Sequence, residues 1–102
     1  MNFCQDDFIT NYGQKIFMFL KDFLYCENEY IFRDLEHLIK NENIKSFYYE
    51  GNKYGILKKL NESTIIIIDE TLEENGGLQD ESRCSIAKSD FLYAIAENKN
   101  LI

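Results

Sequence analysis

The chain has 102 residues, of which 45% are hydrophobic and 15% aromatic, and this is enough for one domain with one core. Its 18 acidic and 11 basic residues give a net charge of -7, which opposes binding to nucleic acid or to an anionic membrane. We therefore expect residues 1–102 to form a single acidic domain whose natural partner is a basic protein.

The cysteines and the start of the chain bear on its compartment. Cys4, Cys26 and Cys84 are odd in number and lack C-x-x-C spacing, which argues against a disulfide framework and a zinc knuckle. No basic segment opens the chain, and the apolar run 16–20 is far shorter than the roughly 18 residues of a membrane span. These features predict a soluble, cytoplasmic protein.

Two helices are expected first. Apolar residues recur at helical spacing over 6–25, with Gly13 as a weak point, and again over 29–41, where Asn28 suits the N-cap position. The run 16–20 is apolar most of the way round its helix. Either two layers of the domain cover it or a partner chain does, which leaves a homodimer open.

A β-hairpin is expected next, because the apolar period changes to two after Ile44. Gly51 and Asn52 are predicted to form its tip, since glycine supplies the positive φ of a tight turn. This tip predicts the following neighbours: Glu50 and Lys53, Tyr49 and Tyr54, and Phe47 and Ile56 on paired strands, with Tyr48 over Gly55 on the other face.

The second half of the chain completes an α+β fold. The isoleucine run 65–68 predicts a central strand buried on both faces, and 73–77 predicts a flexible turn. A short fourth strand is expected over 83–86, and Ser89 with Asp90 is expected to cap a last helix. The predicted fold is two N-terminal helices, a three- to four-stranded antiparallel sheet with its hairpin at Gly51-Asn52, and a C-terminal helix.

Enzymatic and metal-dependent functions find little support in the sequence. The main cofactor and hydrolase motifs are missing, and no motif joins the only histidine, His37, to Cys84. The calcium-loop pattern fails after Asp69, because Thr71 stands where an oxygen donor is required. We expect no enzyme, no cofactor and no metal site.

An acidic segment carries the candidate binding site. Between residues 69 and 81 the chain has six carboxylates and no lysine or arginine, directly after the isoleucine run. Carboxylates attract a basic partner over distance, and an exposed tyrosine supplies a desolvated anchor at an interface. The predicted partner-binding residues are Asp69, Glu70, Glu73, Glu74, Asp80, Glu81 and Tyr48, with Tyr30 and Tyr93 as further anchors.

The expected function is inhibition of another protein. A small acidic chain of this kind suits an immunity-type protein that neutralises a basic toxin, such as a nuclease, by occluding its active site or substrate surface. One alternative is a phage anti-defence protein that mimics the charge of nucleic acid, which needs acids over a longer face. Another alternative is a small adaptor or subunit of a larger assembly that docks through the apolar side of 16–20.

Overall fold

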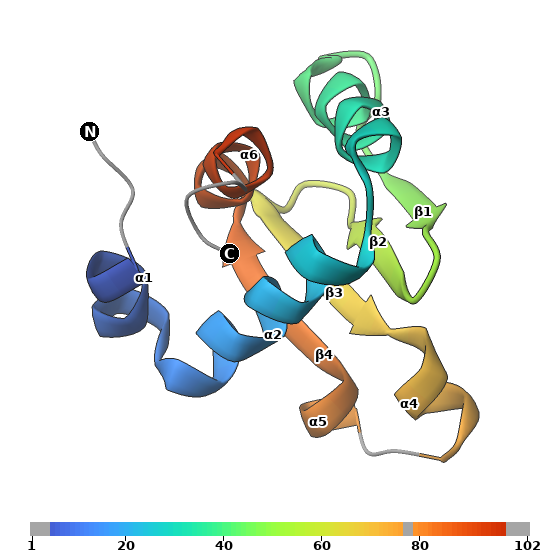
Figure 1. The fold of residues 1–102 in the computed structure, drawn as a ribbon. Coiled ribbons are helices and arrows are strands. Elements are labelled where there is room, and N and C mark those ends of the chain that lie inside the picture. The colour runs from blue at the N-terminus through green and yellow to red at the C-terminus, as the bar shows by residue number, and fades with distance from the viewer. Residues whose placement is uncertain (1–4, 77–78, 98–102) are drawn as a thin grey trace.

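The computed structural model describes residues 5–76 and 79–97 and shows an α+β fold (Figure 1). Three helices come first, a four-stranded antiparallel sheet follows, and a helix comes last. The predicted fold class is therefore confirmed, with one more N-terminal helix than expected. The elements are α1 (Gln5–Tyr12), α2 (Gln14–Cys26), α3 (Glu29–Lys40), β1 (Phe47–Glu50), β2 (Tyr54–Lys58), β3 (Thr64–Asp69), α4 (Glu70–Glu74), α5 (Gln79–Ser82), β4 (Arg83–Ala87) and α6 (Lys88–Ala96).

The N-terminal helical region is divided at Gly13. This residue has φ +94° and ψ 161°, a conformation that glycine adopts readily and that no helix contains. The prediction of one helix over 6–25 is therefore wrong, and α1 and α2 fold back on each other through the rings of Phe8 and Phe17, 5.9 Å apart. The prediction of the next helix is confirmed, since the Asn28 side chain caps α3 by accepting from the Ile31 N–H at 3.1 Å.

The sheet has the order β1-β2-β3-β4, and each strand pairs antiparallel with the next along the chain. The predicted hairpin is present as β1 and β2, but its tip is Asn52-Lys53 and not Gly51-Asn52, and Gly51 is not among the glycines with positive φ. The predicted register is therefore wrong by two residues: Tyr49 pairs with Ile56 and Glu50 with Gly55. A shift by two residues keeps every side chain on its expected face.

The register shift has a physical cause in the carboxylate of Glu27, which lies at the junction of α2 and α3. Its oxygens accept hydrogen bonds from the backbone N–H groups of Asn52 and Lys53 at 2.9 Å each, and of Tyr54 at 3.0 Å. Only Asn52 and Lys53 lie outside the strand pairing, because the Gly51 N–H donates to the Tyr54 carbonyl at 2.9 Å, and the turn directs their N–H groups toward the carboxylate. Asp22 adds a second tie, since it accepts from the Tyr54 hydroxyl and from Lys53 Nζ.

The core lies between one face of the sheet and the helices α2, α3 and α6 (Figure 1). Ile65 and Ile67 of β3 point into it and are fully buried. Ile66 points to the other face and is only half-buried, so the prediction that β3 is covered on both faces is wrong there. Ile68, also on that face, is buried at the end of the strand, from which α4 folds back toward β2.

In the last part of the chain, one prediction is confirmed, one is wrong and one is right only in part. The fourth strand is present as β4, as predicted. Ser89 and Asp90 do not cap α6: its N-cap is Ala87, and Asp90 instead accepts a hydrogen bond from the Tyr12 hydroxyl. In the predicted turn 73–77, Asn75 and Gly76 do form a turn, Glu73 and Glu74 belong to α4, and residue 77 lies outside the described residues.

Candidate functional site

The fold uses two of the predicted binding carboxylates internally. Asp69 caps α4 by accepting from the Leu72 N–H at 3.0 Å, and it lies 3.9 Å from Lys53 Nζ. The Asp69 carboxylate therefore has a structural role at the end of β3, where the helix N-terminus also favours negative charge.

Glu73 is the second internal carboxylate. It accepts from Arg83 Nε at 2.7 Å and from an Arg83 terminal nitrogen at 3.1 Å, and the Ser82 hydroxyl adds a bond at 2.9 Å. These hydrogen bonds, led by those from Arg83, lower the pKa of Glu73 despite its partial burial. The bidentate pair ties α4 to β4, and it neutralises one of the charges expected to attract a partner.

Glu70 and Tyr48 meet over Gly55, on the sheet face away from the main core. A Cβ on Gly55 would lie 2.2 Å from Oε1 of Glu70 and 2.6 Å from the hydroxyl of Tyr48, so both side chains occupy the space that glycine leaves. The Tyr48 side chain thus reaches over Gly55 as predicted, although the cross-strand partner of Tyr48 is Leu57 and not Gly55. Oε1 of Glu70 is buried, and no described residue gives it a hydrogen bond.

Two further carboxylates lie on the same side of the sheet as Glu70 and Tyr48. Glu50 is the cross-strand partner of Gly55 and is exposed, and Glu74 follows Glu70 by one helical turn and is exposed too. We call the set Tyr48, Glu50, Glu70 and Glu74 the Gly55 patch. Among the described residues, none of its three carboxylates makes an ion pair. Glu50 was missed in the sequence because it was assigned to Lys53, although it lies two residues from Tyr48 and so shares its face.

The electrostatics of the patch centre on Glu70. Burial raises the pKa of its carboxyl, and the negative charges of Glu73 and Glu74 raise it further, while Arg83 acts weakly in the other direction. The surroundings of Glu70 therefore disfavour the ionised form of its carboxyl group. Tyr48 beside it is 52% exposed, which leaves much of its ring open to another molecule.

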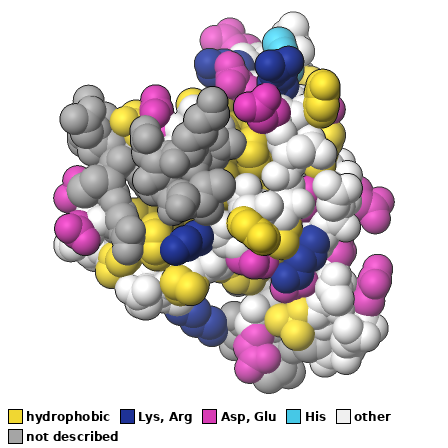
Figure 2. Space-filling model, viewed as in Figure 1, with side chains coloured by type: hydrophobic (Ala, Val, Ile, Leu, Met, Phe, Trp, Pro, Cys, Tyr) yellow, Lys and Arg dark blue, Asp and Glu magenta, His cyan; other side chains and the backbone are white. Residues whose placement is uncertain are grey.

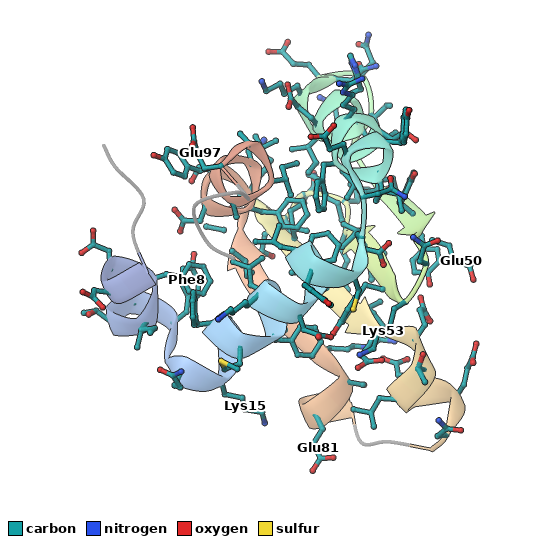
Figure 3. The ribbon with its side chains drawn as sticks, viewed as in Figure 1. Phe8, Lys15, Glu50, Lys53, Glu81 and Glu97 are labelled. Carbon is teal, nitrogen blue, oxygen red and sulfur yellow. The ribbon has the colours of Figure 1, made fainter. Side chains whose placement is uncertain are left out.

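The remaining predicted residues lie elsewhere. Glu81 is exposed on α5, well apart from Glu50 at the β1–β2 hairpin (Figure 3). The side chain of Asp80 lies outside the described residues. Tyr30 and Tyr93 belong to α3 and α6, which cover the opposite face of the sheet, so neither can join the Gly55 patch. On the face seen in Figure 2, the acidic side chains are scattered among basic ones.

Within the described residues, the thiol and imidazole groups considered in the sequence do not come together in a reactive centre. Cys84 is buried in β4, and burial raises the pKa of its thiol to about 12, which keeps it protonated at neutral pH. His37 is exposed on α3. Within residues 5–76 and 79–97, no group of three or more His, Cys, Asp or Glu side chains is placed to hold a metal ion.

Comparison with protein-family models, with curated protein sequences and with solved structures found no match to this chain. None of the helices in the described part of the chain combines the length and the apolar character needed to cross a membrane.

Proposed function

We propose that this protein is a cytoplasmic, protein-binding inhibitor that docks a basic partner on the Gly55 patch. The partner class that fits best is a basic toxin such as a nuclease, which makes the protein an immunity-type inhibitor. The single observation that carries the proposal is the buried, unpartnered Oε1 of Glu70 next to an exposed tyrosine.

The unpartnered oxygen of Glu70 supports binding, because its burial destabilises the protein when no partner is bound. A buried carboxylate oxygen without a donor pays a desolvation penalty of about 1–3 kcal/mol or more. A lysine or arginine from a partner would supply the missing donor, so part of that penalty would be recovered on complex formation. Glu50 and Glu74, exposed on either side, would raise the rate of encounter with a positively charged surface.

Tyr48 gives the patch its anchor. Tyrosine is enriched at the energetic centres of protein interfaces, because a rigid ring buries much apolar surface and its hydroxyl still makes a hydrogen bond. Here the hydroxyl lies over Gly55 next to the Glu70 carboxylate, while 52% of the side chain remains exposed. A phosphate-binding active site offers the cations that this combination requires, which is why a nuclease is the preferred partner.

The test is affinity capture from the host with three baits. The first bait is the wild type, and the second is Glu70→Lys with Glu74→Lys. The third, Glu42→Lys with Glu62→Lys, carries the same change of net charge at two exposed loop positions. A partner of the Gly55 patch is retained by the first and third baits, is lost from the second, and is basic. Its association rate should fall by at least tenfold in the second variant, with a weaker dependence on salt.

Two results would count against the proposal. A capture profile that is identical for all three baits would mean that the patch docks nothing. A captured protein that loses affinity equally with the second and third baits would respond to net charge alone. For a captured enzyme, the further requirement is that purified wild-type protein suppresses its activity at equimolar concentration, while the Glu70→Lys, Glu74→Lys variant does not.

A second candidate, a subunit or adaptor role, is favoured by the outer side of α2. Met18 is 51% exposed and Tyr25 77% exposed, and the two line a shallow hollow with Lys21 and Asp22. Exposed apolar side chains at helical spacing are typical of helix-mediated contacts. Met18→Asp should abolish such an assembly and leave binding at the Gly55 patch unchanged, because α2 covers the other face of the sheet.

A further inference from the structure

The strand β4 forms one edge of the sheet, and the hydrogen-bond pattern shows which of its backbone groups point outward. Lys88 N–H donates to the Ser63 carbonyl at 2.9 Å, which extends the ladder between β3 and β4 by one bonded pair. Bonded and non-bonded pairs alternate in an antiparallel ladder, so Ile86 and Cys84 direct their N–H and C=O groups toward β3. Ser85 and Ala87 therefore direct theirs away from the sheet.

Among the described residues, the outward N–H of Ala87 has a hydrogen-bond partner, whereas the outward groups of Ser85 have none. The Ala87 N–H donates to the Tyr12 hydroxyl at 3.1 Å, and this bond confirms the direction derived from the ladder. Tyr12 is held there by its own hydrogen bond to Asp90. At Ser85, which is exposed, no described residue pairs with the N–H or the C=O on this side. The edge is thus protected at its Ala87 end and open around Ser85.

A groove runs beside the open part of this edge. It has a volume of about 490 Å³ and is lined by Lys15, Ile16 and Phe19 of α2, by Glu81 of α5, and by residues 83–85 of β4. Ile16 and Phe19 are half-buried and form an apolar wall. Figure 3 shows Lys15 and Glu81 projecting from α2 and α5 on either side of the gap, and Figure 2 shows the surface hollowed there.

We propose that this groove binds an extended segment of another protein, which adds to the sheet as a fifth strand beside β4. Only an extended backbone can satisfy the Ser85 N–H and C=O together while it places alternate side chains against Ile16 and Phe19. Such a segment is apolar where it faces this wall and basic where it passes Glu81. Glu81 is exposed and makes no ion pair among the described residues, whereas the Arg83 guanidinium is already held by Glu73.

A second copy of the chain fits the edge less well than a short segment. Each copy carries a net charge of -7, which opposes self-association. In addition, α1 lies beyond the same edge, with Tyr12 bonded to Ala87, so a whole second sheet would have to pass it (Figure 1). A segment of three or four residues opposite Arg83–Ser85 meets neither obstacle.

The test uses peptides selected from a random dodecamer library displayed on phage, with wild-type protein as the target. We expect peptides whose binding slows hydrogen exchange at the Ser85 amide, measured by NMR. N-methylation of such a peptide should weaken binding at least tenfold at alternate positions only, because only every second N–H faces β4. This readout needs no variant of the protein.

Two variants make the test specific to the backbone. Ser85→Pro removes the outward N–H, and its ring is tolerated on an edge strand, so it should fold and weaken binding at least tenfold. The matched control Ser85→Ala keeps the backbone and should bind within twofold of the wild type. For a peptide with a basic residue at the α5 end, Glu81→Lys should weaken binding and Lys15→Glu should strengthen it.

This proposal can fail independently of the proposed function. The double variant Glu70→Lys, Glu74→Lys should leave peptide binding within twofold of the wild type, since its changes lie at the Gly55 patch. The proposal is overturned if selection yields no binder, if no bound peptide protects the Ser85 amide, or if Ser85→Pro binds as well as Ser85→Ala. Dimerisation of the free protein that is abolished by Ser85→Pro would overturn it in favour of a second copy.

Discussion

Glu27 and Glu70 both have carboxylate oxygens that are buried away from water, but they differ in the hydrogen-bond donors that these oxygens receive. Glu27 is only 6% exposed, and its oxygens accept three backbone N–H groups of the β1–β2 loop. Glu70 has a buried oxygen without any donor among the described residues. The carboxylates of this acidic chain therefore differ in their surroundings: Glu27 holds the fold together through its donors, whereas Glu70 has an oxygen for which the described residues supply none.

The largest effect should come from removing the loop acceptor. Glu27→Gln replaces one carboxylate oxygen by an NH₂ group that faces backbone donors, so we expect a loss of about 2–3 kcal/mol in the free energy of unfolding. Urea denaturation measures it, with Glu62→Gln on an exposed loop as the control, for which about 0.5 kcal/mol or less is expected. Equal effects of the two substitutions would remove the distinction between Glu27 and a surface glutamate.

A smaller loss of stability is expected at Glu73, which resembles Glu27 in that its carboxylate accepts hydrogen bonds. Glu73→Gln should destabilise the protein by about 1 kcal/mol at neutral pH, because it weakens a partly exposed bidentate pair with Arg83. The pKa of Glu73 is lowered in the folded state, so the ionised form favours folding. Its contribution is present at neutral pH and is lost as the pH falls through that lowered pKa. Denaturation of both proteins at several pH values should show the difference vanishing in acid.

The smallest effect has the opposite sign. Glu70→Gln removes an uncompensated charge, so we expect it to stabilise the protein by about 0.5 kcal/mol at neutral pH. Because the pKa of Glu70 is raised in the folded state, its protonated form favours folding. The difference in the free energy of unfolding between the wild type and the variant should therefore disappear as the pH falls through this pKa. A destabilising effect of Glu70→Gln at neutral pH would show that Glu70, like Glu27, serves the fold.

The local elements could be predicted from sequence because their signals are local. The helical spacing over 29–41 and the Asn28 cap predicted α3 to within one residue at its end, and the alternation after Ile44 predicted the hairpin. The isoleucine run predicted β3 correctly. It did not predict the burial of the second face, because a second layer covers that face only at Ile68.

The remaining features depend on contacts between distant residues. The hairpin register follows from Glu27, more than twenty positions before the loop that it organises. The pairing of Glu73 with Arg83 depends on how α4 and α5 fold back, which the composition of an acidic segment does not reveal. The Gly55 patch combines two residues of β1 with two of α4, and only Tyr48, Glu70 and Glu74 were found from charge and exposure.

The hydroxyl of Tyr12 has a consequence for how the chain behaves when it is shortened. It blocks the last outward donor of β4 and is supplied by the end of α1. A shortened protein that begins after Gly13 would lose this hydrogen bond together with the buried Phe8 ring, and it would expose a longer β-edge. Such an edge is a template for aggregation, so we expect the shortened protein to aggregate more readily than residues 1–102 do.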